Sequence, residues 1–189
     1  MRVVAGALRG RRIEAPPGTD TRPTTDKVRE ATFNALGSLD LVRDALVADL
    51  FAGSGALGIE ALSRGAAQCT FVERDRSALR TLRANLVTLD LDDRSKVVPG
   101  DAATRAAGIT ADLVLADPPY GFDDWVGLLG RIRAPFVVAE SGGELPAVAG
   151  WTITRSKRYG RSWVTFFERA DEQPEAAAPG IIAAADQQQ

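Results

Sequence analysis

The chain has 189 residues, a net charge of −2, 45% hydrophobic residues and 25% charged residues. This composition supports one packed domain and excludes both wholesale disorder and a uniformly basic surface. The absence of histidine excludes Ser–His–Asp and Cys–His triads and HExxH zinc sites, and no metal site is expected. Because no apolar run approaches the ~20 residues of a membrane span and the N-terminus lacks a secretory signal pattern, we expect a cytoplasmic protein.

The first 23 residues are interpreted as an arm that contains a small β-hairpin. Short apolar stretches alternate there with glycines and arginines, and Pro16-Pro17-Gly18 is typical of a turn. Thr24 and Thr25 have the side chains that cap helix N-termini, and apolar residues recur after them at helical spacing as far as Gly37. A helix is therefore predicted to follow the two threonines and to end at this glycine.

From residue 45 onward, apolar runs of strand length alternate with stretches of helical spacing. Continuous apolar runs suit parallel strands that are buried on both faces, and the alternation is typical of βαβ units in a doubly wound sheet. Strands are predicted at residues 45–51, 69–72, 95–98, 111–116 and 136–139, and helices from the glycine-rich segment to Arg64, at 76–89, after Asp101 and at 122–132.

The end of the chain departs from this alternation. Residues 151–156 and 163–168 are predicted strands with no room for a helix between them, so we expect an antiparallel hairpin at the edge of the sheet. The expected fold class is therefore α/β and Rossmann-like, with a mostly parallel sheet and an antiparallel last hairpin. We assign this domain to residues 24–169. Residues 170–189, rich in Glu, Gln, Ala and Pro, are predicted to be a disordered tail.

A glycine-rich loop between the first predicted strand and its helix indicates a nucleotide-like ligand. The segment from Gly53 through Gly55 to Gly58 fits the pattern G-x-G-x-x-G, in which glycines permit a tight turn and a close approach of the backbone to a ligand. Glu73 follows at the end of the second predicted strand, where a carboxylate can accept hydrogen bonds from both hydroxyls of a ribose. NAD and S-adenosylmethionine (SAM) fit these features equally well.

The segment Asp117-Pro118-Pro119-Tyr120, after the fourth predicted strand, indicates methyl transfer to an amino nitrogen conjugated with an aromatic ring. The lone pair of such a nitrogen is delocalised, and two acceptors that hold its N–H bonds aim that lone pair at a methyl group. The Asp117 carboxylate and the Pro118 carbonyl are suitable acceptors, because successive prolines make the backbone rigid. The ring of Tyr120 offers a stacking surface for a base, worth ~1–3 kcal/mol.

Four acidic residues follow or end predicted strands, namely Asp49, Glu73, Asp101 and Asp117. Open parallel sheets bind ligands at the carboxyl ends of their strands, and the shared negative field there favours the cationic sulfonium of SAM over the anionic pyrophosphate of NAD. The Asp101 carboxylate could also accept a hydrogen bond from an adenine amino group while the Ala102 N–H donates to the ring. Capping of the following helix by Asp101 is the alternative.

Four segments of the chain resemble the RsmD-type bacterial methyltransferases, which act on the N2 amine of guanine in small-subunit ribosomal RNA. The block from Arg22 to Glu30, R-P-T-T-D-K-V-R-E, is the most specific of these segments. The glycine loop and D-P-P-Y occur in many methyltransferases. The resemblance spans roughly residues 1 to 168, and its segments are Arg22–Glu30 with Phe33-Asn34, Asp49–Gly58 with Glu60–Arg64, Phe71–Asp75 and Asp117–Tyr120.

The resemblance implies a seven-stranded SAM-dependent methyltransferase fold, a catalytic segment at Asp117–Tyr120 and a guanine of 16S rRNA as the substrate, within a 30S particle or an assembly intermediate. It also implies that the Thr24-Thr25 segment folds over the cofactor. The stretch between the fourth and fifth strands is short, so the substrate-side surface is expected to be trimmed. The expected cofactor-binding residues are Asp49, Phe51, Gly53, Ser54, Gly55, Glu73, Arg74, Asp101 and Ala102, together with Thr24 and Thr25.

Two clusters of basic residues are candidates for contacting phosphates in a chain that is otherwise slightly acidic. The first belongs to the N-terminal arm and the second to the last hairpin, and both are predicted to flank the D-P-P-Y pocket of a monomer. A solvated surface with no RNA is the alternative interpretation. The arginines expected to bind RNA are Arg9, Arg11 and Arg12 in the arm, and Arg158 and Arg161 in the hairpin.

Three other functions compete with guanine-N2 methylation. D-P-P-Y also suits an adenine-N6 methyltransferase of DNA or RNA, although a chain of this length leaves no room for a DNA target-recognition domain. A non-catalytic SAM-binding or RNA-binding protein would have no need of the amine grip. An NAD oxidoreductase is the most distant alternative.

Overall fold

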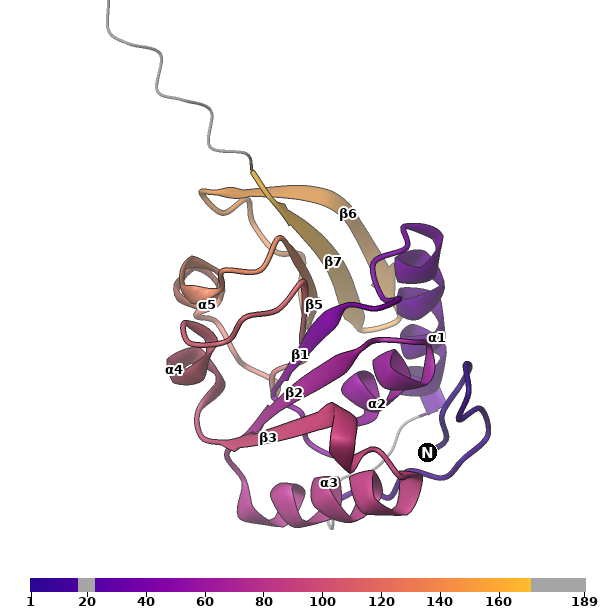
Figure 1. The fold of residues 1–189 in the computed structure, drawn as a ribbon. Coiled ribbons are helices and arrows are strands. Elements are labelled where there is room, and N and C mark those ends of the chain that lie inside the picture. Colours follow the sequence, from indigo (N-terminus) through magenta and orange to yellow (C-terminus); the bar gives the residue numbers. More distant parts are fainter. Residues whose placement is uncertain (17–22, 171–189) are drawn as a thin grey trace, which may run out of the picture.

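The computed structural model describes residues 1–16 and 23–170, and this part of the chain forms a seven-stranded sheet with helices on both faces (Figure 1). The strand order is β3-β2-β1-β4-β5-β7-β6. The strands β1 to β5 are parallel neighbours, and β7 pairs antiparallel with both β5 and β6. Their bounds are β1 Leu46–Leu50, β2 Gln68–Glu73, β3 Ser95–Pro99, β4 Leu113–Ala116, β5 Phe136–Ser141, β6 Trp151–Tyr159 and β7 Ser162–Arg169.

This architecture confirms the predicted fold class, including the antiparallel last hairpin at the sheet edge. All four residues of β4 are buried, because this strand lies near the middle of the sheet and is covered on both faces. The hairpin strands are longer than predicted, and only the short turn around Gly160 separates them. The predicted tail lies outside the described residues, apart from Ala170.

The helices divide between the two faces of the sheet as the direction of the crossovers requires. Helices α1, α2 and α3 cover one face, and α4 and α5 cover the other (Figure 1). After the edge strand β3, the chain returns to the middle of the sheet to form β4, and the helices that follow β3 lie on the other face. The strand order therefore reverses between β1 and β4. The bounds are α1 Pro23–Ser38, α2 Ala56–Ser63, α3 Arg76–Leu89, a 3₁₀ turn Asp92–Arg94, α4 Ala102–Ala106 and α5 Trp125–Arg131.

The first helix begins three residues earlier than predicted. Helix α1 starts at Pro23, so Thr24 and Thr25 lie inside its first turn instead of preceding it as caps. Proline suits the first helical position because its φ is already near the helical value and its missing N–H would have had no partner in the helix. The side chains of both threonines lie outside the described part of the structure.

The N-terminal arm forms the predicted small hairpin and packs into the main core. The Val3 N–H donates to the Arg11 carbonyl at 3.0 Å and the Ile13 N–H donates to the Met1 carbonyl at 3.0 Å, with one antiparallel bridge between Arg2 and Arg12. The side chains of Val3 and Ile13 are buried in the cluster formed with α1, α2 and α3. Burial of these two residues holds the arm against the face of the domain that α1, α2 and α3 cover.

None of the described helices has the length and apolar character needed to cross a membrane.

Candidate functional site

A cavity of about 660 Å³ opens at the carboxyl ends of the central strands. It lies where the strand order reverses, which is the usual ligand position in open α/β sheets. Of the predicted cofactor and catalytic residues, the cavity brings together Phe51, Gly53, Glu73, Arg74, Ala102, Asp117 and Pro119. The further lining residues, which the sequence analysis did not single out, are Pro16, Val72, Asp75, Ser77, Ala78 and Gly100.

The glycines of the loop between β1 and α2 serve different purposes. Gly53 and Gly55 have φ values of 55° and 84°, in the left-handed region that other residues rarely adopt. A Cβ on Gly55 would come within 2.4 Å of Leu82, and one on Gly58 within 2.3 Å of the Phe71 ring. A Cβ on Gly53 would meet only the Phe51 carbonyl, at 3.9 Å. The first glycine therefore faces open space in the cavity, Gly55 permits close packing against α3, and Gly58 permits close packing of α2 on β2.

Asp49 lies behind this loop and does not line the cavity. Its side chain is 1% exposed, and its Oδ2 accepts a hydrogen bond from the Gly58 N–H at 2.9 Å. Burial raises the pKa of Asp49 from 3.8 to about 7, opposed by the Gly58 hydrogen bond and assisted by the negative charge of Glu73. Asp49, which was predicted to contact the cofactor, thus holds the start of α2. Ser54 and Gly55 also lie outside the cavity lining.

Glu73 braces the glycine loop in addition to facing the cavity. Its Oε2 accepts from the Gly53 N–H at 2.8 Å, and its Oε1 accepts from the N–H groups of Arg74 and Asp75 at 2.7 Å each. A carboxylate offers about four acceptor positions, so one remains for a ligand hydroxyl. The side chain that was predicted to hold a ribose therefore also fixes the backbone on which the ligand would rest.

Asp101 caps helix α4, as the alternative in the sequence analysis allowed. Its Oδ1 accepts from the Thr104 N–H at 3.0 Å and from the Thr104 hydroxyl at 3.1 Å. Its Oδ2 lies 3.7 Å from Nη1 of Arg74. The Thr104 backbone hydrogen bond is the main cause that lowers the pKa of Asp101, with the Arg74 charge assisting. Of this pair of predicted contacts, Ala102 lines the cavity and Asp101 does not.

The D-P-P-Y segment forms the wall of the cavity at the end of β4. Asp117 and Pro119 line the cavity, and Tyr120 projects outward with 75% of its surface exposed. The segment is held by Phe122, whose ring makes edge contacts with Phe51 at 5.4 Å between centroids and with Trp125 at 5.1 Å. Helix α5 begins at Trp125, so Phe122 lies in the loop before it and not at the start of the helix as predicted.

Asp117 is exposed as a residue, because the cavity beside it is open to solvent, whereas its carboxyl group is surrounded by protein atoms at the end of β4. This crowding is the main cause that raises the pKa of Asp117 well above its ordinary value, and the nearby carboxylates of Glu140 and Asp49 add to it. Glu140 is the next-to-last residue of β5, one strand away, and it was not among the predicted site residues. The signal was available, because Glu140 follows the fifth apolar run just as Asp117 follows the fourth.

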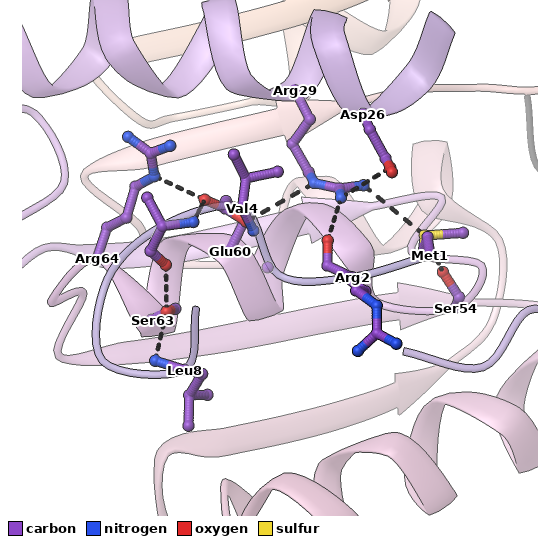
Figure 2. A network of polar contacts seen from close by, with 12 residues as sticks. Met1, Arg2, Val4, Leu8, Asp26, Arg29, Ser54, Glu60, Ser63 and Arg64 are labelled. Carbon is purple, nitrogen blue, oxygen red and sulfur yellow. Dashed lines mark hydrogen bonds and ion pairs between the residues drawn. The ribbon is translucent and has the colours of Figure 1, made fainter. Parts of the chain in front are cut away.

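A buried ion-pair network fixes the arm to the domain (Figure 2). Glu60 of α2 is fully buried, and its carboxylate accepts from the N–H groups of Val4 at 2.8 Å and Ala5 at 3.0 Å and from Nε of Arg64 at 2.7 Å. Arg29 of α1 approaches the same carboxylate at 3.7 Å and donates to the Arg2 carbonyl at 2.7 Å. This network was not predicted, because its partners are far apart in the sequence.

The two basic clusters occupy different parts of the molecule. Arg11 donates to the Thr88 carbonyl at 2.9 Å, at the end of α3 that lies about 15 Å along the helix from the cavity residue Ala78. Arg12 pairs with Glu14 at 3.0 Å. The hairpin cluster lies at the cavity edge of the sheet, because Ser141 at the carboxyl end of β5 pairs with Trp163 beside the hairpin turn. The structure therefore separates Arg11 from the pocket that it was predicted to flank.

Comparisons with known sequences show that this chain is similar to rRNA methyltransferases. The model of the family described as conserved hypothetical protein 95 matches residues 1–168. The chain is 41% identical to YlbH of Bacillus subtilis, provisionally assigned as an rRNA methyltransferase, over 89% of this chain and 99% of the relative. It is 37% identical to ribosomal RNA small subunit methyltransferase D of Escherichia coli, over 89% of this chain and 90% of that protein.

Solved structures share the fold over most of their length. YhhF of Escherichia coli, provisionally assigned as a methyltransferase, has a TM-score of 0.78 and 38% identity, covering 89% of this chain and 97% of its own. A hypothetical protein from Thermus thermophilus has a TM-score of 0.74 and 27% identity, covering 89% of this chain and 99% of its own. The short segment between β4 and β5 is therefore compatible with matches that cover 89% of this chain.

Proposed function

The chain belongs to the family of conserved hypothetical protein 95, the RsmD-type methyltransferases, and from this premise we propose that it methylates the N2 amine of a guanine in 16S rRNA with SAM as the methyl donor. The observation that carries the proposal is the position of Asp117-Pro-Pro-Tyr. This segment forms one wall of the cavity whose other walls are the glycine loop and Glu73. One cavity thus joins a nucleoside-binding loop to a group suited to holding an aromatic amine.

The chemistry of the cavity fits SAM, which when bound supplies a methyl group on a positively charged sulfur. Glu73, Asp75 and Asp117 place acidic groups around the cavity. Arg74 also lines it, but the charge of its guanidinium is matched by Asp101 at 3.7 Å. The remaining acceptor position of Glu73 suits a ribose hydroxyl, and Gly53 leaves room for the nucleoside against the backbone.

The D-P-P-Y segment holds the amine that receives the methyl group. The Asp117 carboxylate and the Pro118 carbonyl accept the two N–H bonds of the guanine amine, which aims its lone pair toward the cofactor. Tyr120 is sufficiently exposed to stack on the purine. Because guanine N2 takes part in base pairing, the target guanine must be unpaired or turned out of its helix before it reaches the pocket.

The β6–β7 hairpin is the best-placed surface for the RNA backbone. It carries Arg158 and Arg161 near its turn, at the same edge of the sheet as Asp117. Arg9, Arg11 and Arg12 of the arm would contact a more distant part of the substrate. A substrate that spans both clusters is larger than one hairpin, which favours a 30S particle or an assembly intermediate in the cytoplasm. We propose that the protein binds this substrate as a monomer.

The test uses isotope-labelled SAM and four substrates, namely naked 16S rRNA, 30S particles from cells that lack this enzyme, 30S particles from wild-type cells, and duplex DNA. Label should enter the rRNA of unmethylated particles or the naked rRNA, and it should enter neither the wild-type particles nor the DNA. The Asp117→Ala variant serves as the matched control for contaminating methyltransferases. Label that enters only DNA, or label that persists with the variant, would contradict the proposal.

A further inference from the structure

Glu140 stands directly beside the catalytic carboxylate. Strands β4 and β5 are parallel neighbours in which Ala116 is paired with Ala139, so Asp117 and Glu140 are the residues that follow this pair. Neighbouring strands lie ~4.8 Å apart, which brings the two carboxyl groups close together at the same edge of the sheet. Asp117 lines the cavity, whereas Glu140 is half-buried and is not a lining residue. Glu140 can therefore act on a ligand only through its neighbour.

The charges around this pair are mostly negative. The negative charge of Asp49, in β1, raises the pKa of Asp117. The Ser162 hydroxyl of β7 donates a hydrogen bond to Glu140. In residues 1–16 and 23–170, no arginine or lysine forms an ion pair with either Asp117 or Glu140. Arg74, the basic residue in the lining of the described cavity, pairs with Asp101, and Arg158 of the hairpin donates to the Gly160 carbonyl.

Neighbouring carboxylates that lack a cation resist being ionised together. Burial raises the pKa of Glu140, and burial followed by the charge of Glu140 raises the pKa of Asp117 well above its ordinary value. A carboxylate with a raised pKa accepts a proton more readily at neutral pH, which is the property required of a general base. Without Glu140 beside it, the Asp117 carboxylate would be a weaker base.

We propose that Glu140 is a positioning residue that makes Asp117 the general base for methyl transfer. This inference rests on the proposed function. The amine nitrogen forms a bond to the methyl carbon while the sulfur–methyl bond breaks, and the electron pair of that bond stays on sulfur. The Asp117 carboxylate takes one proton from the nitrogen, which leaves a neutral N-methyl amine. Asp117 then releases this proton to the water that reaches the cavity, and the cycle closes with one proton produced for each methyl group transferred.

The decisive variant is Glu140→Gln, which keeps the shape of the side chain and removes its charge. Two measurements are made on the full-length protein. The first is the pH profile of kcat and KM for methylation of unmethylated 30S particles. The second is the titration of Asp117 followed by ¹³C NMR of labelled aspartate carboxyls, assigned by loss of its signal in Asp117→Asn. Glu140→Asp tests rescue by a conserved charge, and Glu144→Gln, an exposed loop residue, is the matched control.

In Glu140→Gln, the acidic limb of the kcat profile and the Asp117 titration should both move to lower pH. The plateau value of kcat should fall roughly tenfold, a part of the ~10²–10⁴-fold that general base catalysis contributes. KM should change little, and both Glu140→Asp and Glu144→Gln should resemble the wild type. An unchanged titration, or an acidic limb that stays in place while the titration moves, would overturn the inference. If no RNA is methylated at all, the proposed function fails, and the titration still decides whether Glu140 sets the protonation of Asp117.

Discussion

Replacement of Asp49 by asparagine should remove the unfavourable free energy of ionising a buried carboxyl group, which destabilises the wild-type fold at neutral and alkaline pH. The buried carboxyl has a folded-state pKa of about 7 against an ordinary value of 3.8. A group whose pKa is raised on folding binds more protons in the folded state, so between these two values the free energy of unfolding falls as pH rises. A shift of about three pKa units at 1.36 kcal/mol each amounts to about 4 kcal/mol across the whole range. About 2.7 kcal/mol of this change lies between pH 5 and pH 8.

The assay is urea unfolding of wild type and Asp49→Asn at several pH values from 5 to 8, with the free energies extrapolated to water. Asparagine can still accept the Gly58 hydrogen bond through its side-chain oxygen, so the loop geometry is retained. The stability of the variant relative to wild type should rise by about 2.7 kcal/mol between pH 5 and pH 8, and the contributions of groups that do not interact with Asp49 cancel in this difference. The pKa of Asp117 should fall in the variant, because the charge of Asp49 raises it, and this change acts in the same direction. A difference that is independent of pH would refute the assignment of a raised pKa to Asp49.

Four further predictions concern the ligands. Glu73→Ala should weaken SAM binding measured by calorimetry by roughly 1.5–3 kcal/mol for each hydrogen bond removed, and unchanged affinity would remove Glu73 from the site. Asp117→Ala should bind SAM nearly as wild type but lose most turnover, because the hydrogen bonds to the amine act in the transition state. Tyr120→Phe should keep most activity, whereas Tyr120→Ala should lose it. Equal inactivity of the two Tyr120 variants would refute the stacking role. Replacing Arg158 and Arg161 together should weaken binding to ribosomal particles and leave SAM affinity intact. The slope of log binding constant against log salt concentration should become shallower by about one unit for each phosphate that is no longer bound. A wild-type slope would show that the two arginines are ordinary surface residues.

The elements and the walls of the cavity were predictable from the sequence because they depend on local patterns. Apolar runs marked the strands, and helix α3 has the predicted bounds Arg76–Leu89. The glycine loop and D-P-P-Y were recognised because each follows a strand. Parallel strands bring their carboxyl ends to one edge, so the meeting of Gly53, Glu73 and Asp117 in one cavity follows from topology alone.

The sequence could not decide the roles of individual carboxylates, although it offered capping by Asp101 as an alternative, because these roles depend on which backbone N–H each side chain reaches. Asp49 and Asp101 both follow the pattern of a ligand contact, yet one holds the start of α2 and the other caps α4. Glu140 follows an apolar run as Asp117 does, but no motif surrounds it, and the pairing of β4 with β5 is what places it beside Asp117. The contact between Arg11 and the end of α3 joins residues 77 positions apart, which no local pattern could indicate.

The identity of the methylated nucleoside tests the central claim most directly. Unmethylated 30S particles are incubated with the protein and labelled SAM, and the extracted 16S rRNA is digested to nucleosides and separated by chromatography with mass detection. The label should coincide with N2-methylguanosine, at one guanine per particle, and it should be absent with Asp117→Ala. Label that coincides with N6-methyladenosine, or with a methyl group on carbon or ribose oxygen, would contradict the claim that the Asp117-Pro-Pro-Tyr pocket holds the amine of guanine.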